Sequence, residues 1–127
     1  MNLILYSEGE EIYISAKGGL RPLIECIRRF QGHTGCTLYD KVIGLAAARL
    51  IAYSGIASKL RTTVISKPAL KYLHEKGIHT EADSVVPNIL TKDRSAVCPG
   101  ERKAEQIPNE KIFYEHMMAV YSDMEHD

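Results

Sequence analysis

The stretch that decides the fold runs from Asp40 to Gly55 and reads DKVIGLAAARLIAYSG. Asp40 has the side chain of a helix N-cap, because its carboxylate accepts hydrogen bonds from the first-turn N–H groups and lies at the positive end of the helix dipole. Gly55 suits the left-handed residue just past a helix end. Between them only Lys41 and Arg49 are charged, so the sequence predicts a helix that is apolar nearly all round and packed between other elements.

Gly44 interrupts the start of this predicted helix. A glycine there lowers helix stability by about 1 kcal/mol relative to alanine. Together with the alanines at 46–48, it predicts a backbone that approaches a neighbouring element closely.

Length and composition predict one soluble domain over residues 1–127. The chain has 16 Lys and Arg against 16 Asp and Glu, so no global field favours a polyanion, and we expect no nucleic-acid partner. The 3 cysteines are too few for a disulfide framework and indicate a reducing, cytoplasmic setting. The apolar segment 1–6 is only a strand long, which predicts neither a leader nor a membrane partner.

Strand and helix patterns alternate along the chain and predict an α/β fold. The pattern begins with a hairpin of two apolar strands and continues with helices and β-branched runs in turn. We expect strands at 2–6, 11–15, 61–66 and weakly at 78–82, helices at 22–30, 40–55, 67–76, 84–90, from 99 and at 109–122, a connection at 33–39, and a frayed tail at 123–127.

The first constellation with chemical potential is the set of His33, Cys36 and Asp40, with Cys98 as a fourth member. Imidazole, thiolate and carboxylate are all zinc ligands. The sequence lacks the paired spacings that typify zinc sites, so we predict no metal and no cofactor, with Asp40 acting as a cap and Cys36 as a small semi-buried residue.

A second constellation is the run from Cys98 to Glu101, which reads CPGE. If proline opens a helix here, Cys98 lies at the helix N-terminus, where the dipole lowers a thiol pKa. Glu101 then either completes a capping arrangement or serves as an acid or base. The alternative is a buried cysteine that simply precedes a helix.

A third feature is the place of two predicted helix starts. One helix start follows a strand and the other follows a loop, and both are expected to open on the same crevice, which is the usual binding site in α/β sheets. The N–H groups at two helix starts favour an anionic ligand there. Asp40, Lys41, Ser66 and Lys67 would line it. The alternative is capping alone, with both lysines in solvent.

The order of elements resembles the cytidine-deaminase-like fold. The motifs DKVIGLAAA from Asp40, Ser66 with Ala69 and Leu70, Gly77-Ile78, and CPGE from Cys98 are similar to a small uncharacterised prokaryotic family assigned to that superfamily. The resemblance implies a three-layer α/β/α domain whose mixed sheet starts with a hairpin. Zinc deaminases of the superfamily carry His-x-Glu at the first helix start and Pro-Cys-x-x-Cys at the second.

This chain has DKV at 40–42 and SKPAL at 66–70 in those places, so the resemblance implies no zinc-dependent deamination. Our preferred hypothesis is that the protein binds a small nucleotide-like or anionic ligand. One alternative is a thiol-dependent enzyme that uses Cys98, with Glu101 or Asp40 as acid or base and His33 or His79 as an auxiliary. Another is a structural or regulatory homodimer formed through the predicted C-terminal helix, residues 113–121. Whether the chain is an enzyme stays open.

Overall fold

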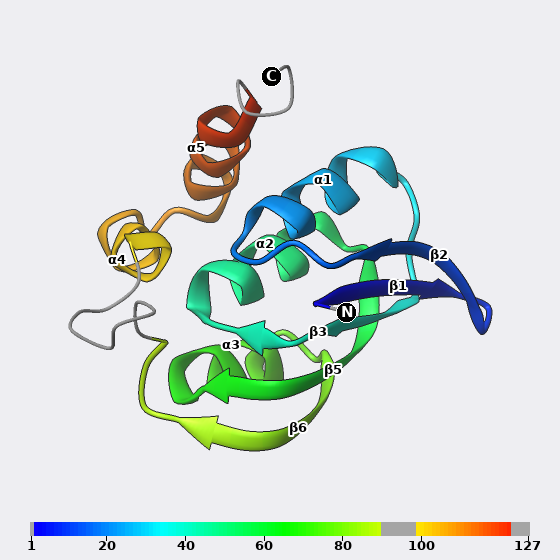
Figure 1. Ribbon diagram of the computed structural model, residues 1–127. Coiled ribbons are helices and arrows are strands. Elements are labelled where there is room, and N and C mark those ends of the chain that lie inside the picture. Colours follow the sequence, from blue (N-terminus) through cyan, green and yellow to red (C-terminus); the bar gives the residue numbers. More distant parts are fainter. Residues whose placement is uncertain (1, 90–98, 123–127) are drawn as a thin grey trace.

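The structure, a computed structural model, describes residues 2–89 and 99–122 (Figure 1). In this part the chain forms six strands and five helices. Their bounds are β1 Leu3–Ser7, β2 Glu10–Ser15, α1 Arg21–Arg29, β3 Cys36–Asp40, β4 Val42–Ile43, α2 Leu45–Ser54, β5 Ala57–Ser66, α3 Lys67–Glu75, β6 His79–Val86, α4 Pro99–Gln106 and α5 Glu110–Ser122.

The predicted N-terminal hairpin is confirmed. β1 and β2 pair antiparallel, and the two residues between them, Glu8 and Gly9, both have positive φ, 52° and 83°. Two successive left-handed residues match the twist of the flanking strands, and glycine adopts that conformation without steric cost.

The sheet is mixed and open, as the α/β prediction required. Its order is β2-β1-β3-β5-β4, and β6 pairs with β5 beside this path. β1 runs antiparallel to β3, whereas β3, β4 and β6 all run parallel to β5. Helices α2 and α3 make the crossovers between parallel strands. Both helices therefore begin at the same end of the sheet, where the parallel strands have their carboxyl ends.

The core lies between one face of this sheet and the helices. Leu5, Leu38 and Leu60 point to that face from three neighbouring strands, and each is fully buried. Helix α2 packs against α1 and α3 in the helical layer and against α4 and α5 on its other side. The predicted all-round burial of α2 is therefore confirmed, and Gly55 ends it with φ 68°.

The beginning of α2 differs from the prediction. The helix starts at Leu45, and Asp40 is the last residue of β3 instead of a helix cap. Val42 and Ile43 pair with Val64 and Ile65 of β5, so the sheet holds these residues extended. Sheet pairing thus overrides the local capping signal.

The other face of the sheet is open in the described residues. Helix α2 contacts both α1 and α3, and the three lie on the same face, which leaves one helical layer on the sheet where the resemblance implied two. The open face carries charged side chains on β5 and β6, including Lys59, Arg61 and Glu81.

Two segments were assigned wrongly from sequence. Residues 36–40 form the central strand β3, where the sequence predicted a connection over 33–39 followed by a helix cap at Asp40. Residues 84–86 continue β6, where a helix was predicted, because they pair with Val64, Ile65 and Ser66 of β5. The long strand β5 supplies the hydrogen-bonding partner in both cases, which a local pattern does not reveal.

Candidate functional site

The predicted cap Asp40 is part-buried on the helical side of β3. Its carboxylate accepts backbone hydrogen bonds from Lys41 and Val42, yet burial outweighs them and raises its pKa to about 7 from an ordinary 3.8. Asp40 also lies near enough to Cys26 of α1 to raise the pKa of that thiol, which burial and the nearby Cys36 bring to about 12. Asp40 therefore faces the side of the sheet on which α1 packs.

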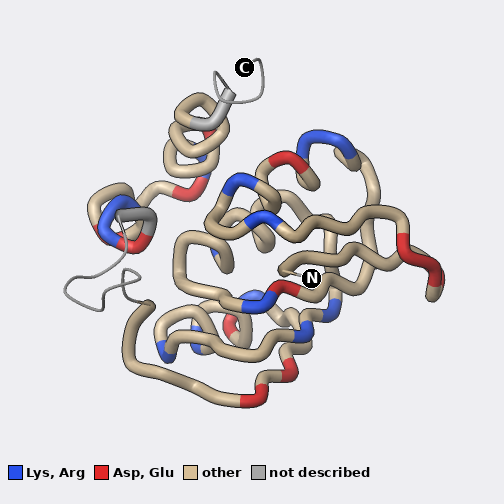
Figure 2. The backbone as a smooth tube through the Cα atoms, viewed as in Figure 1, with Lys and Arg blue, Asp and Glu red and all other residues tan. Residues whose placement is uncertain are grey.

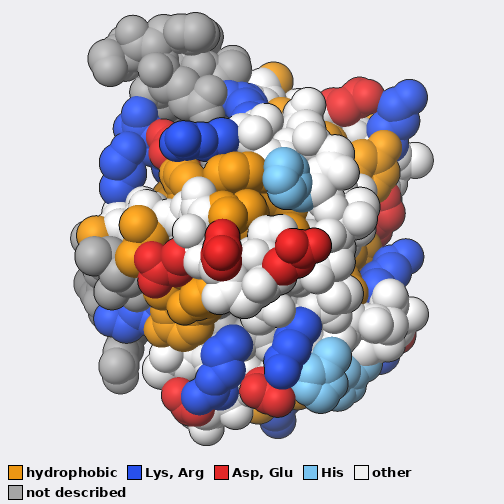
Figure 3. All heavy atoms as spheres, turned by 90° about the vertical axis from the view of Figure 1, so that its right-hand side faces the viewer, with side chains coloured by type: hydrophobic (Ala, Val, Ile, Leu, Met, Phe, Trp, Pro, Cys, Tyr) orange, Lys and Arg blue, Asp and Glu red, His pale blue; other side chains and the backbone are white. Residues whose placement is uncertain are grey.

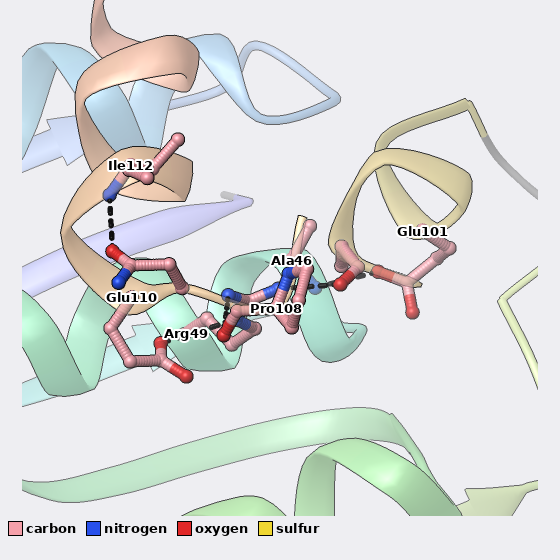
Figure 4. A network of polar contacts seen from close by, with 8 residues as sticks. Ala46, Arg49, Glu101, Pro108, Glu110 and Ile112 are labelled. Carbon is pink, nitrogen blue, oxygen red and sulfur yellow. Dashed lines mark hydrogen bonds and ion pairs between the residues drawn. The ribbon is translucent and has the colours of Figure 1, made fainter. Parts of the chain in front are cut away.

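The N-terminus of α2 is capped by Glu101, which comes from α4 (Figure 4). The two oxygens of its carboxylate accept from the backbone N–H groups of Leu45 at 2.7 Å and Ala46 at 2.8 Å. Negative charge is favourable at this end of a helix. The sequence indicated a capping role for Glu101 but assigned it to its own helix.

Gly44 makes room for that carboxylate. A Cβ atom at Gly44 would lie 2.4 Å from one Glu101 oxygen, closer than any real contact. The close approach predicted for this glycine is thus found, and the neighbour is the side chain of Glu101, 57 positions later in the sequence.

Arg49 forms the second link between α2 and the C-terminal helices. Its guanidinium, 4% exposed, donates to the carbonyls of Ala104 and Pro108 and pairs with Glu110 at 3.2 Å (Figure 4). It also lies 4.1 Å from the centre of the Phe113 ring. These contacts attach the region between α4 and α5 to the middle helix of the core.

The predicted crevice residues take different positions. Ser66 is buried, and its hydroxyl caps α3 by accepting from the backbone N–H of Ala69 at 3.3 Å. Lys41 and Lys67 are exposed. Because Ile43 pairs with Ile65, the starts of α2 and α3 are neighbours, but the first already holds the Glu101 carboxylate.

The remaining candidate residues are dispersed. Cys98 lies outside the described residues. Cys36 is buried, and His33 is exposed with its ring against Phe30. In the described ranges no three His, Cys, Asp or Glu side chains come together as a metal-binding group. His79 pairs with Glu81 at 3.3 Å on the exposed edge strand β6.

Sequence reasoning missed a hollow of about 400 Å³ on the open face of the sheet. Its lining comes from alternate residues of β1, β3, β5 and β6, since alternate side chains of a strand share a face. These residues are Ile4, Tyr6, Thr37, Tyr39, Lys59, Arg61 and Glu81. In the sequence, six of the lining residues form three pairs that are each two positions apart, at 4 and 6, 37 and 39, and 59 and 61. Only the strand register brings these three pairs together.

The hollow has an aromatic part and a charged part. Tyr6 and Tyr39 are diagonal neighbours on β1 and β3, because Tyr39 pairs with Ile4. The Tyr39 hydroxyl lies 3.2 Å from the hydroxyl of Thr63. Lys59 and Arg61 follow on β5, so an aromatic surface adjoins two cations.

An acidic row on β6 borders these cations (Figure 2). Arg61 pairs with Asp83 at 2.7 Å, whereas Lys59 reaches Glu81 only at 3.9 Å. The hydrogen bond from His79, with help from Lys59, lowers the pKa of the Glu81 carboxyl. Lys59 is therefore the more weakly engaged cation of the hollow.

The fold defines the class as a mixed open α/β sheet with one helical layer and two C-terminal helices on α2. No described helix combines the length and hydrophobicity that a membrane span requires. Residues 1–120 match the family described as TM1506, domain of unknown function (DUF1893), and the chain belongs to this family.

A solved relative supports this membership. It is a DUF1893 family protein (TM1506) of Thermotoga maritima, 31% identical, with a TM-score of 0.85. The match covers 94% of this chain and 80% of that chain. No curated protein matches this chain.

Proposed function

We propose that this chain is a small-ligand-binding protein of the cytidine-deaminase-like fold that carries out no zinc-dependent deamination. The strand order β2-β1-β3-β5 and the parallel units crossed by α2 and α3 support the deaminase-like assignment. DKV at 40–42, which precedes α2, and SKPAL at 66–70, at the start of α3, contain neither the His and Cys ligands of the zinc deaminases nor the proton-shuttling glutamate.

The ligand is a planar ring that carries one anionic group, as in a nucleoside monophosphate, and its site is the hollow on the open sheet face. The observation that carries this proposal is the placement of two tyrosines and two cations around one hollow. Its volume, about 400 Å³, falls within the range of small-molecule sites.

Each part of the hollow has a matching part in such a ligand. Stacking of a base on an aromatic side chain contributes about 1–3 kcal/mol and tolerates different bases. The Lys59 ammonium can pair with a phosphate group, because its present partner, the Glu81 carboxylate, is 3.9 Å away. The hydroxyl groups of Thr37 and Tyr39 add hydrogen-bonding groups between the aromatic and cationic parts.

The surroundings favour a small anion over a polyanion. Glu81 and Asp83 form an acidic row on β6, directly beside the cations of β5. A nucleic-acid strand long enough to cross the sheet would bring further phosphates against this row, and the chain has no net positive charge to offset the repulsion. The proposal therefore excludes nucleic acid as the partner, as the sequence did.

The crevice of Asp40, Lys41, Ser66 and Lys67 remains an alternative place for an anionic ligand. The Glu101 carboxylate supports it in one respect, because the first N–H groups of α2 already donate hydrogen bonds to an anionic group. The same carboxylate fills that position, so an outside ligand has to displace it. The open hollow requires no displacement and is our first choice. The enzyme that uses Cys98 stays a prediction.

The experiment is an NMR titration of ¹⁵N-labelled protein with adenosine monophosphate, adenosine and inorganic phosphate. We expect the monophosphate to shift amides of β1, β3 and β5 and to bind more tightly than either fragment. Lys59→Gln weakens the monophosphate and leaves adenosine unchanged, whereas Tyr39→Leu weakens both. Lys71→Gln, an exposed lysine of α3, is the matched control.

Two results would contradict the proposal. One is a folded protein whose spectrum none of the three compounds changes. The other is a set of shifts confined to residues 44–46 and 66–69, which would move the ligand to the helix-start crevice.

A further inference from the structure

A histidine at the start of β6 lies next to the hollow on the open sheet face. His79 pairs in register with Lys59 of β5, and Lys59 lines the hollow. Residues paired in this way carry their side chains on the same face of a sheet, so the His79 ring lies on the open face. Figure 3 shows histidine beside interleaved basic and acidic side chains on the lower part of the molecule.

His79 and Lys59 share one acceptor atom. The Nε2 atom of His79 lies 3.3 Å from Oε1 of Glu81, and the Lys59 ammonium lies 3.9 Å from the same oxygen. Both side chains lower the pKa of the Glu81 carboxyl, and the hydrogen bond from His79 is the larger cause. The two basic groups therefore compete for one carboxylate oxygen. Imidazole is the one of the two that ordinarily changes its charge between pH 5 and 8.

The second cation of the hollow has a different partner. Arg61 pairs with Asp83 at 2.7 Å, one step further along β5 and β6 than Lys59 and Glu81. Guanidinium and carboxylate groups ordinarily keep their charge between about pH 5.5 and 8. Of the charged groups on this part of the open face, His79 is thus the one expected to change its charge in that range.

Helix α3 also packs against β6, but on the opposite face of the sheet. Lys76, at the end of α3, has its ammonium 5.5 Å from the centre of the Tyr72 ring of the same helix. The other basic and acidic residues of α3 are Lys67, Lys71, His74 and Glu75. The sheet separates these groups from the hollow.

We propose that His79 controls the affinity of the hollow for an anion by deciding whether Glu81 retains Lys59. The inference rests on the ligand site proposed above. A protonated imidazole pairs with the Glu81 carboxylate, so the Lys59 ammonium is available to the anionic group of the ligand. A neutral imidazole leaves Lys59 as the nearest full positive charge to Glu81, which retains it. His79 is a positioning residue, because it acts on the ligand through Glu81.

The expected effect is a higher affinity at lower pH. Protonation of His79 favours the bound anion, so the affinity rises as the pH falls through the range in which imidazole titrates, around pH 6.5. The bound anion favours the protonated ring to the same degree, because the two equilibria are linked. All three side chains are exposed, so we expect a factor of about three to five.

The test is the NMR titration with adenosine monophosphate, repeated at about pH 5.5 and about pH 8. The phosphate group itself titrates near pH 6, so each variant is compared with the original protein at the same pH. We expect His79→Gln to raise the Kd about threefold to fivefold at the lower pH and less than twofold at the higher. His74→Gln, at an exposed histidine of α3, is the matched control and leaves both Kd values unchanged.

A second variant separates competition for Glu81 from a simple addition of charge. Glu81→Gln removes the shared carboxylate, so Lys59 is available at both pH values. We expect this variant to bind adenosine monophosphate about threefold more tightly than the original protein at about pH 8, and to gain less at about pH 5.5. A further readout is the ring of His79 itself. Saturating adenosine monophosphate raises the pH at which its NMR signals are half-titrated and leaves that of His74 unchanged.

The two proposals fail in different ways. Adenosine monophosphate that binds the folded original protein at neither pH overturns both the ligand site and the role of His79. Binding with the same factor for His79→Gln at both pH values overturns the role of His79 alone. An equal gain for Glu81→Gln at both pH values does so too, because Glu81 then acts by its charge and not by retaining Lys59.

Discussion

Two sets of charged side chains in this molecule differ in their surroundings. Between α2 and the C-terminal helices, Arg49 is 4% exposed and pairs with Glu110 at 3.2 Å. On the open sheet face, Arg61 pairs with Asp83 at 2.7 Å, and these side chains are 44% and 55% exposed. The shorter ion pair is thus the one in solvent.

The difference teaches that distance does not rank ion pairs by their effect on stability. An exposed pair loses most of its attraction to solvent screening and to the entropy of ordering two long side chains. A buried charge, once placed, makes each of its partners necessary, because removing one leaves a polar group without a partner in a low dielectric. The following predictions test this contrast, beginning with the largest effect.

Removal of the buried cation has the largest expected effect. Arg49→Met keeps an apolar stem but leaves the carbonyls of Ala104 and Pro108 and the carboxylate of Glu110 without their donor. We expect the free energy of unfolding, measured by urea denaturation, to fall by about 3 kcal/mol, chiefly because two carbonyls lose a charged donor, whereas the Glu110 side chain is 35% exposed and stays hydrated. Arg102→Met, at an exposed position of α4, is the control and changes little. A loss below about 1 kcal/mol would contradict the expected difference in stability between the buried and the exposed ion pair.

A methyl group at Gly44 ranks second. Gly44→Ala forces the Glu101 carboxylate off its two N–H donors, and we expect a loss of about 2–3 kcal/mol by urea denaturation. In a double-mutant cycle, Glu101→Ala removes most of the added cost, so the two losses are far from additive. Gly18→Ala, where a Cβ meets nothing within 4 Å, is the control. Additive losses would disprove the steric account.

The part-buried carboxyl of Asp40 gives a pH dependence. Its folded pKa of about 7 lies above the ordinary 3.8, so the folded state binds its proton more tightly than the unfolded state does. This contribution to stability is complete below about pH 4 and is lost as the pH rises through about 7, by about 1–2 kcal/mol in all since water still reaches part of the side chain. Asp40→Asn removes this slope from a plot of unfolding free energy against pH. An identical slope in both proteins would refute the assignment.

The exposed pair has the smallest expected effect. Arg61→Gln and Asp83→Asn each remove one partner of the 2.7 Å contact, yet both groups remain hydrated. We expect thermal midpoints that match the original protein within error. A clear loss of stability in either variant would show that the sheet face is less exposed in solution than this structure has it.

The sequence was sufficient for features that depend on neighbouring residues. The hairpin, the all-round burial of α2, its stop at Gly55 and the cap of α3 by Ser66 each follow from a local pattern, and the structure confirms them. The space required at Gly44 was also predicted, since a glycine near a helix start needs a reason.

The rest depends on residues that are distant in the sequence. β3 and the end of β6 become strands because β5 pairs with them, and no local signal outweighs that pairing. The α2 cap comes from Glu101, 56 residues after Leu45. In the candidate hollow, Tyr6 and Tyr39 become neighbours only through the β1–β3 register, and Lys59 and Arg61 join them only through the β3–β5 register.

The cap supplied by Glu101 has a consequence for the order of events during synthesis. The ribosome delivers α2 long before α4, so the nascent chain holds a central helix whose first N–H groups and whose Arg49 have no partners yet. Contacts across such sequence separations close late in folding, because the intervening chain has to be ordered first. The core around α2 is therefore complete only after the last quarter of the chain has been synthesised. A ribosome that stalls before this point exposes an incomplete core to chaperones.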